Sequence, residues 1–328
     1  MPVWKTAGTF GRDRDTCSMY ALPQQLMDRA FTAAEAFSRD VPRERLRRKD
    51  IVALGSGVYA TKALAERSTP RGVLVLKVQA LARERPDIWA SHVTAAQLHE
   101  LWLPPRLLDD DAHIHLSQPA ETVIWVRRKG VCGHRVVIRP QDVATRDGFR
   151  LSTPGRTWLE VASLCSVREL IIMGDQLVRH PYPRFEGRTE PHTTVQDLAA
   201  LLDGSRGAPG RRRCLTALGW IRVGADSVQE TALRLALISA GLPEPTLQVP
   251  AKPGFRWSPR ADLGYPAFKL AIQYEGDTHF TPQQQRADQR RDNIFLAEGW
   301  RVLRFNAEDS REGFQRAVSQ VRAAFGLV

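Results

Sequence analysis

Cysteine is scarce in this sequence, and its spacing excludes two kinds of site. The four cysteines form no CxxC pair or comparable cluster: Cys17, Cys132, Cys165 and Cys214. This spacing argues against a cysteine-based zinc site and against a disulfide framework, so we expect a reducing compartment. Lysine is also rare, with 7 residues against 40 arginines, which indicates a GC-rich coding sequence rather than a function.

Long apolar runs are absent as well. The opening residues, Met1–Gly8, lack the apolar stretch of a secretory signal. No later segment approaches the length of apolar sequence that a membrane-spanning helix needs. We therefore expect a cytoplasmic protein without membrane association.

What the sequence does have is length, apolar content and positive charge. Its 328 residues, 43% of them hydrophobic, favour two or three globular domains. The net charge is +11, and basic residues exceed acidic ones by four in 1–65, by six in 66–225 and by one in 226–328. A basic front part favours a polyanionic partner, most often nucleic acid. The alternative is a basic surface without such a partner.

Residues 23–65 have the pattern of a winged helix-turn-helix, after a polar extension over 1–22. Apolar spacing predicts a helix over 24–38, a basic helix follows over 43–49, and residues 51–61 form a hairpin around glycines. We expect DNA contacts from the basic residues of the second helix: Arg43, Arg45, Arg47, Arg48 and Lys49. A solvated basic helix in a small domain without a DNA partner is the alternative interpretation.

Residues 66–203 are predicted to form a mixed α/β domain, which a linker over 204–225 joins to the last domain. Helical spacing and capping residues predict helices over 72–82, 95–101, 154–164, 167–178 and 194–202. Alternation and β-branched residues predict strands over 113–116, 122–126 and 134–138. Residues 181–192, rich in proline, are predicted to be a loop.

Several polar clusters in this middle region invite a functional interpretation. No thiol or carboxylate completes a zinc arrangement around four of the histidines, which we interpret as structural: His92, His99, His113 and His115. The run Asp109–Asp111 is interpreted as an exposed loop. The cluster Arg211–Arg213 either contacts phosphates or marks the solvated start of a helix.

The sequence Arg260–Glu275 predicts two short strands that carry oxygen donors on one face. Side chains alternate across a strand, so Gln273 and Glu275 share a face, and Asp262 on the preceding strand can come alongside them. Three oxygen donors of this kind are suited to a hard cation such as Mg²⁺ or Mn²⁺. Such a cation could activate water for phosphodiester hydrolysis.

A series of spaced motifs extends from this hairpin in both directions. They are, in order, Asp226–Leu235, Ala240–Pro245, Ala261–Pro266, Lys269–His279 and Gly299–Phe305. Over residues 226–328 the chain resembles the Vsr-like group of the restriction-endonuclease-like, PD-(D/E)xK superfamily. The resemblance implies a C-terminal α/β domain with a metal-dependent endonuclease site.

The amino-terminal half has a second resemblance. Gly55–Tyr59, after the basic helix, resembles the winged-helix domain of AbiEi-type antitoxins, and Gln97–His99 and Ser152–Trp158 are similar to their companion domain. This resemblance implies a DNA-binding regulator, and with it a cognate toxin as a possible partner.

The nuclease resemblance assigns roles to individual residues. Asp262 matches the strand aspartate that binds the metal, Gln273 and Glu275 stand at the (D/E)xK pair, and Glu230 matches a carboxylate on the preceding helix. His279 matches a histidine that could transfer a proton near the scissile phosphate. The chain departs from the pattern because Gln273 is neutral and Glu275 replaces the lysine, so the charge that would steady the phosphate is missing.

Alternatives exist for the residues around this pair. Glu230 could instead pair with Arg234 at the i,i+4 spacing of a helix, worth only about 0.3–0.5 kcal/mol. Arg286 and Arg290, on a helix that begins at Pro282, are expected to approach the phosphate, and Arg304 is a further candidate.

We therefore predict an α+β multidomain protein with a winged helix-turn-helix, a mixed α/β middle domain and an endonuclease-like α/β domain. One hypothesis is a DNA-binding endonuclease that uses Mg²⁺ or Mn²⁺ and is targeted by the winged helix. The other is an AbiEi-type antitoxin or regulator whose nuclease fold no longer cleaves.

Overall fold

The computed structural model describes residues 21–108, 113–123, 127–276 and 282–327. The chain divides into two compact units, one formed by residues 1–90 with 111–151 and the other by 91–110 with 152–328. Both units combine helices with β-sheet, as expected for an α+β protein. Within the described residues, no helix has the length and apolar character that crossing a membrane requires.

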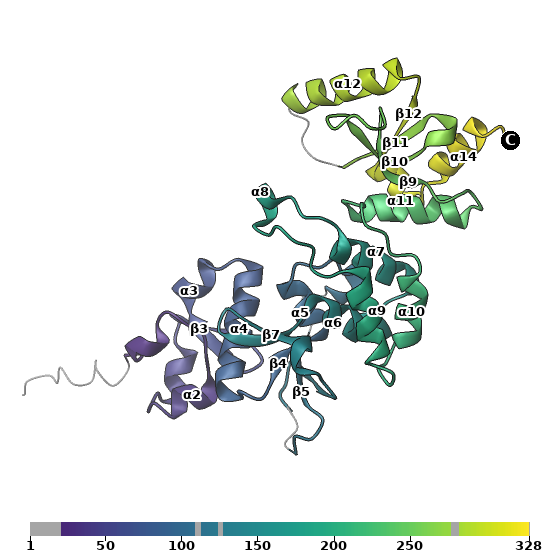
Figure 1. Cartoon of the computed structure of the whole chain (residues 1–328). Coiled ribbons are helices and arrows are strands. Elements are labelled where there is room, and N and C mark those ends of the chain that lie inside the picture. Colours follow the sequence, from purple (N-terminus) through teal and green to yellow (C-terminus); the bar gives the residue numbers. More distant parts are fainter. Residues whose placement is uncertain (1–20, 109–112, 124–126, 277–281, 328) are drawn as a thin grey trace, which may run out of the picture. The chain divides into compact units, whose positions relative to one another are not determined.

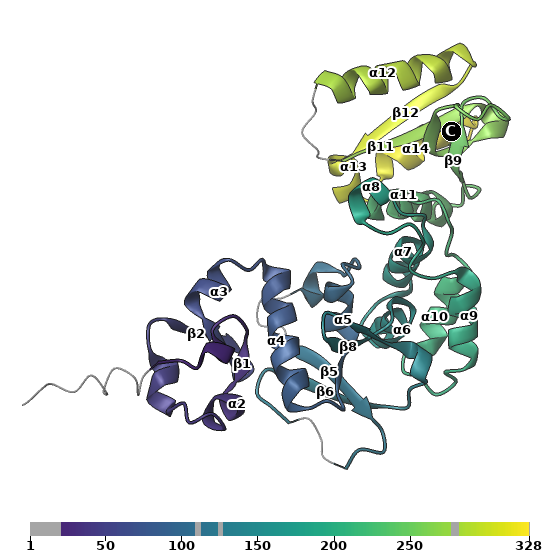
Figure 2. The ribbon, with the colours of Figure 1, turned by 60° about the vertical axis from the view of Figure 1, so that its left-hand side comes forward.

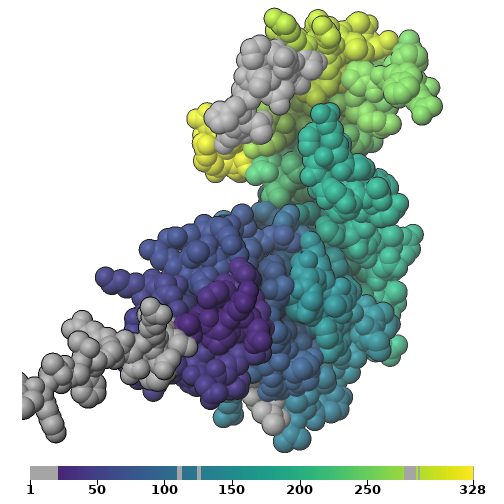
Figure 3. Space-filling model, turned by 90° about the vertical axis from the view of Figure 1, so that its left-hand side faces the viewer, coloured from purple at the N-terminus to yellow at the C-terminus, as the bar shows by residue number. Residues whose placement is uncertain are grey.

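The first unit opens with a small three-stranded sheet in the order β1-β3-β2. The elements up to residue 66 are η1 (Gln24–Leu26), β1 (Phe31–Thr32), α2 (Ala33–Phe37), η2 (Arg43–Arg47), β2 (Ile51–Gly55), β3 (Val58–Thr61) and α3 (Lys62–Glu66). The predicted hairpin is confirmed, since β2 and β3 pair antiparallel. In Figure 3 the purple and blue residues of this unit form one continuous surface.

Two predictions for this segment are wrong. The helix expected over 24–38 is interrupted, because Phe31 and Thr32 are buried and pair with β3. The Thr32 side chain then accepts a hydrogen bond from the N–H of Glu35 at 3.1 Å and starts α2 anew. The basic helix expected over 43–49 is the 3-10 turn η2, which ends where Arg48 adopts an extended conformation ahead of β2.

The rest of the first unit is a long helix and a five-stranded sheet in the order β6-β5-β4-β8-β7. Thr69 caps α4 (Pro70–Glu84), with proline at its first position. The strands are β4 (Trp89–Ala90), β5 (Ile114–Pro119), β6 (Val131–Val136), β7 (Val143–Arg146) and β8 (Phe149–Ser152), with η4 (Pro140–Asp142) before β7. Figure 2 shows α4 beside β5 and β6. Of the strand expected over 122–126, residues 124–126 lie outside the described residues.

A layer of helices forms the first part of the second unit. They are α5 (His92–Leu98), η3 (Pro105–Leu107), α6 (Pro154–Glu160), η5 (Val161–Ser163), α7 (Val167–Val178), α8 (Pro183–Glu186), α9 (Val195–Asp203) and α10 (Arg211–Leu218). Their shared core includes the fully buried Trp158, Leu170 and Leu198. The loop expected over 181–192 is present but contains one helical turn, α8, in which Glu186 accepts from the N–H of Tyr182.

The end of the second unit is a four-stranded sheet between helices. Its elements are α11 (Val228–Ser239), β9 (Thr246–Pro250), β10 (Arg260–Tyr265), η6 (Pro266–Phe268), β11 (Leu270–Glu275), α12 (Pro282–Ala297), β12 (Arg301–Asn306), α13 (Ala307–Arg311) and α14 (Gln315–Ala324). The strand order is β12-β11-β10-β9, and only the β11–β12 pair is parallel. Figure 1 shows α12 on one side of the sheet and α11 with α14 on the other.

Both faces of this sheet are covered, as the alternation along β11 requires. Leu270 and Ile272 belong to the core beneath α11 and α14, whereas Ala271 packs with Phe295 of α12. The predicted alternation of β11 is therefore confirmed. Its second face is apolar at Ala271 and becomes polar toward the end of the strand, at Gln273 and Glu275, which is where the candidate site lies.

Candidate active site

Asp262 and Gln273 lie side by side on neighbouring strands, as predicted. Leu263 pairs with Ile272, and this register places Asp262 opposite Gln273. Asp262 Oδ2 accepts a hydrogen bond from the N–H of Tyr274 at 2.7 Å. Gln273 is 1% exposed, and the end of its side chain faces the Asp262 carboxylate. With the amide nitrogen on that side it would donate to both carboxylate oxygens at 3.2 Å, and with the amide oxygen on that side it could share a cation with Asp262.

Glu230 lies in the first turn of α11, where it is 7% exposed. Its backbone N–H donates to the capping Ser227 Oγ at 3.1 Å, and its Oε2 accepts from the N–H of Asp226 at 2.8 Å. Burial raises the pKa of Glu230, and the negative charge of Asp262 raises it further. Burial also raises the pKa of Asp262. Helix and sheet thus place two buried carboxyl groups where each disfavours the ionisation of the other.

The alternative ion pair between Glu230 and Arg234 does not form. The Arg234 guanidinium is buried and donates instead to Asp175 at 2.9 Å, to Glu244 at 2.6 Å and to the carbonyl of Trp220 at 2.8 Å. The i,i+4 spacing is satisfied in sequence, but the Arg234 side chain leaves α11 toward α7. The carboxylate of Glu230 accepts instead from the N–H of Asp226 at the start of α11.

A cation approaches the site from a different strand than the superfamily pattern expects. Gln273 on β11 pairs in register with Arg304 on β12. The Arg304 guanidinium donates to Glu275 and, through its Nε at 3.1 Å, to Asp292 of α12. The positive charge that the sequence lacks at position 275 is therefore present beside it, because a parallel strand supplies it.

Three residues at the site were not predicted from the sequence. Asp226 presents its carboxylate next to Glu230. Its Oδ2 accepts from the Tyr182 hydroxyl at 2.6 Å and from the Gln248 amide at 3.2 Å. The hydrogen bond to Asp226 is the main reason why the pKa of Tyr182 is raised. Tyr182 lies 44 residues before Asp226, so local spacing carries no signal for this contact.

The acidic groups are near one another without forming a compact cage. Within the described ranges, no three carboxylates each bring an oxygen within 4.8 Å of the other two. Glu230 and Asp262 are the pair whose charges interact most directly. Their arrangement suits a hard cation that completes its shell with water and substrate oxygens, as Mg²⁺ does.

The remaining predicted residues of the nuclease site are placed only in part. His279 lies outside the described residues, so its predicted role as a proton donor has no structural counterpart here. Arg286 and Arg290 are exposed on α12. Their predicted contact with a phosphate stays a prediction.

The basic residues of the first unit differ in what they can contact. Arg43, Arg47, Arg48 and Lys49 are exposed on η2 and the turn after it. Arg45 is buried, and its guanidinium donates to both oxygens of Asp50, at 2.9 and 2.6 Å. These two hydrogen bonds fix the turn ahead of β2. The Arg45 side chain is therefore part of the fold and is not exposed for the DNA contact that was predicted for it.

The arginine cluster at α10 is largely committed to the fold. Arg213 donates to the carbonyls of Ala162, Ser163 and Cys165 at 3.0–3.3 Å, and Arg211 donates to the carbonyl of Leu202 at 2.7 Å. The close packing extends to Gly210, where φ is +77° and a Cβ would lie 2.6 Å from the backbone of Ala162. Here arginines saturate the carbonyls at helix ends.

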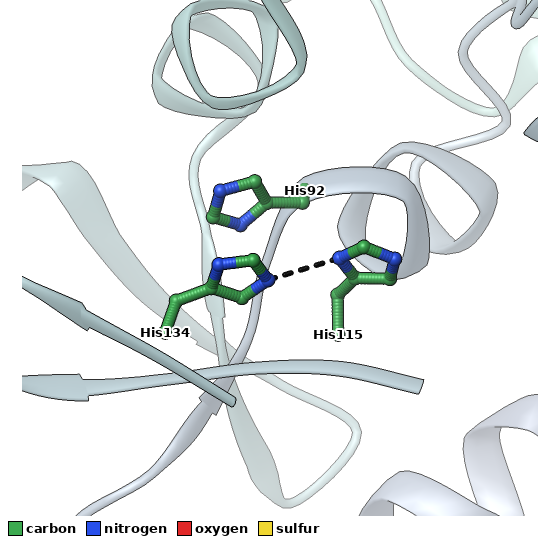
Figure 4. A group of neighbouring side chains, drawn as sticks. All are labelled: His92, His115 and His134. Carbon is green, nitrogen blue, oxygen red and sulfur yellow. Dashed lines mark hydrogen bonds between the residues drawn. The ribbon is translucent and has the colours of Figure 1, made fainter. Parts of the chain in front are cut away.

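Two histidines of the first unit form a pair. His115 on β5 and His134 on β6 lie 3.0 Å apart between ring nitrogens and stack at 5.2 Å between centroids (Figure 4). Burial and the second ring lower the pKa of His115 to about 4, and burial also lowers the pKa of His134. Figure 4 also draws His92, which belongs to the second unit.

Comparison with known proteins gives little further information. No family model matches the chain, and no solved structure matches it. Two uncharacterised proteins of Mycobacterium tuberculosis, from strains CDC 1551 / Oshkosh and ATCC 25618 / H37Rv, are each 31% identical over 100 residues. The match covers 30% of this chain and 36% of each relative, so the chain spans about a third of their length.

Proposed function

We propose that residues 226–328 form a metal-dependent DNA endonuclease domain of the Vsr-like, restriction-endonuclease-like type. One observation carries the proposal: Glu230 of α11 and Asp262 of β10 are two interacting carboxyl groups, each with a raised pKa. Arg234 pairs with Asp175 and Glu244 and Arg304 with Glu275 and Asp292, and the charges of Arg291 and Arg304 only partly offset the burial of Asp262. Titratable groups perturbed in this way gather at functional sites.

A divalent cation explains why the chain tolerates this pair. Burying a carboxylate without a counter-charge costs several kcal/mol, and a bound Mg²⁺ or Mn²⁺ would remove that cost. Glu230 and Asp262 would hold the ion, and the Gln273 amide would keep Asp262 in place. When bound, the ion would activate a water molecule and neutralise charge on the phosphate.

Arg304 could supply the positive charge that is missing at position 275, where the superfamily pattern has a lysine. It lies beside Gln273 in the sheet and is shared by Glu275 and Asp292. A guanidinium fixed in this way can stabilise negative charge that develops on a phosphate. Glu275 then orients Arg304, in place of the direct metal ligation that the resemblance implied for it.

The first unit supplies the proposed targeting to duplex DNA. The β2–β3 hairpin and the exposed Arg43, Arg47, Arg48 and Lys49 support a winged-helix interpretation. Contacts from such residues to phosphates would make binding depend steeply on salt concentration.

The second candidate function is an AbiEi-type regulator whose nuclease fold does not cleave. Gln273 favours it, because a neutral amide at this position supplies no charge to a cation. Such a protein would bind its own promoter, would act with a cognate toxin, and would hold DNA without hydrolysing it.

The decisive experiment separates cleavage from binding. Supercoiled plasmid is incubated with Mn²⁺ and with the wild type, Asp262→Ala, Glu230→Gln or the control Asp203→Ala, whose carboxylate is exposed on α9. We expect nicking by the wild type and the control, and only background nicking by the two site variants. No cleavage with any divalent ion, together with a promoter footprint that Asp262→Ala leaves intact, would establish the regulator instead.

A further inference from the structure

The loop between β9 and β10 presents two large aromatic side chains to solvent. Trp257 is 77% exposed and Phe255 is 58% exposed. Between them stands Arg256, whose guanidinium lies 5.2 Å from the centre of the Trp257 ring. Exposed aromatic surface of this kind commonly marks a contact site for a partner.

Hydrogen bonds close the base of this loop. The N–H of Ala251 donates to the carbonyl of Pro259 at 2.9 Å, and the N–H of Lys252 donates to Ser258 Oγ at 2.8 Å. Trp300 Nε1 donates to the carbonyl of Ala251 at 2.9 Å and ties the base of the loop to the sheet. Because the base of the loop is already closed, binding through its rings would cost less conformational entropy.

The loop leads directly into the candidate site. Arg260, at its end, is the first residue of β10 and pairs with Pro250 of β9. Asp262 follows two positions later on the same strand. On the β9 side, Gln248 accepts from Arg260 through its carbonyl and donates to Asp226 through its amide. The loop therefore lies at the end of β10 that carries Asp262 and beside the end of β11 that carries Gln273 and Glu275, because these two strands are antiparallel.

The charge of the loop favours a polyanion. No Asp or Glu occurs between Thr246 and Ala261, whereas Lys252, Arg256 and Arg260 do. Basic side chains interleaved with exposed aromatic rings match a nucleic-acid strand, since the rings stack on bases and the cations contact phosphates. The neighbouring carboxyl groups would repel a phosphate backbone unless a cation is present, so these basic residues also offset that repulsion.

We propose that the loop over 251–260 binds unpaired bases of the substrate strand next to the scissile phosphate. Phe255 and Trp257 stack on bases, and Arg256 contacts the backbone. This inference rests on the proposed nuclease function, and it narrows the substrate to single-stranded or locally unpaired nucleic acid.

The test measures binding without hydrolysis. A fluorescein-labelled oligothymidylate of about ten nucleotides, which suits one stacking platform, is titrated in EDTA with the full-length chain while anisotropy is followed. We expect Trp257→Ala to weaken binding roughly 5- to 150-fold, the loss typical of one stacked base. The control Trp220→Ala, at a less exposed tryptophan in the same unit, should leave the affinity unchanged.

Salt dependence separates stacking from charge. Over about 50–200 mM salt, Arg256→Gln should lower the slope of log K against log[salt] by about 0.7, the value for one phosphate contact on a single strand. Trp257→Ala should weaken binding while leaving this slope intact. A general loss of folding would change both quantities together.

Each outcome has a defined consequence. Equal affinity of wild type and Trp257→Ala for the oligonucleotide overturns the inference, and a changed sedimentation coefficient in that variant would then assign the loop to contacts between copies of the chain. Weakened binding without any plasmid cleavage supports the loop as a strand-binding element and rejects the nuclease. Plasmid cleavage that is the same in the wild type and in Trp257→Ala supports the nuclease and rejects the loop as a strand-binding element.

Discussion

Arg234 offers the sharpest test of how the second unit is held together. Its guanidinium is 0% exposed and contacts Asp175, which is 1% exposed, across the packing of α7 on α11. Asp175 also accepts from Thr231 Oγ1 and from the N–H of Arg222, both at 2.8 Å. The change Arg234→Met keeps an unbranched apolar side chain and removes the guanidinium with its charge.

The expected loss follows from the burial of the remaining partner. Removing one member of a buried ion pair costs about 3–5 kcal/mol, because the other charge is left without compensation. For a unit of this size each kcal/mol lowers Tm by about 2–4 °C, so we expect Tm to fall by roughly 6–20 °C. Thermal unfolding followed by circular dichroism measures it.

The pH dependence of the loss identifies its cause. Burial raises the pKa of Asp175 even with Arg234 present, and without Arg234 that pKa rises further. When the pKa of a carboxyl group is higher in the folded than in the unfolded protein, the folded protein loses stability as pH rises, because folding then requires the uptake of a proton. The deficit of Arg234→Met should therefore be larger near pH 8 than near pH 5.

A matched arginine provides the control. Arg222 also pairs with Glu244, at 3.0 Å, but both side chains are partly exposed. Arg222→Met should cost no more than about 1 kcal/mol, as surface ion pairs do. If Arg234→Met lowers Tm no more than Arg222→Met, the buried pair does not hold α7 to α11 and the reasoning fails.

Two further predictions concern the sites themselves. Tyr182→Phe removes the hydroxyl that orients Asp226, so we expect the Mn²⁺ affinity of the full chain, measured by calorimetry, to fall about 10–100-fold; an unchanged affinity would show that Asp226 has no part in the site. His115→Gln should lessen the loss of stability between about pH 6.5 and pH 4, because the lowered pKa keeps His115 neutral in the folded protein and its protonation favours unfolding as pH falls. Urea unfolding at several pH values would contradict this if wild type and variant responded alike.

The sequence was informative where the relevant spacing is local. The alternation along Leu270–Glu275 and the turn before it predicted the hairpin, and a two-residue period leaves one register that buries the apolar face. Asp262 therefore came to lie opposite Gln273 as expected. Capping residues are equally local signals, since Ser227 Oγ accepts from the N–H of Glu230 only three positions later.

The partners of individual side chains could not be predicted in the same way. Arg234 was compatible with Glu230 by spacing, yet it binds Asp175, which is 59 residues away. Arg304 reaches Glu275 only because β12 lies parallel beside β11. Such contacts depend on how distant segments pack, and a periodic pattern carries no information about that.

These long-range partners change how the departures from the superfamily pattern should be judged. The fold pairs Arg234 with Asp175 and Glu244, and Arg304 with Glu275 and Asp292. The charges of Arg291 and Arg304 lower the pKa of Asp262, but burial outweighs them, and the charge of Asp262 raises the pKa of Glu230.

Either a proton on Glu230, whose pKa is raised to about 8, or a bound cation would relieve this repulsion. In the proposed site, cation binding and hydrolysis are nevertheless separate properties, because the neutral Gln273 would supply no charge to a cation, whereas Arg304 would stabilise negative charge on a phosphate. Mn²⁺ binding alone is compatible with both the endonuclease and the non-cleaving regulator. The nicking assay with Asp262→Ala is therefore the measurement that distinguishes between them.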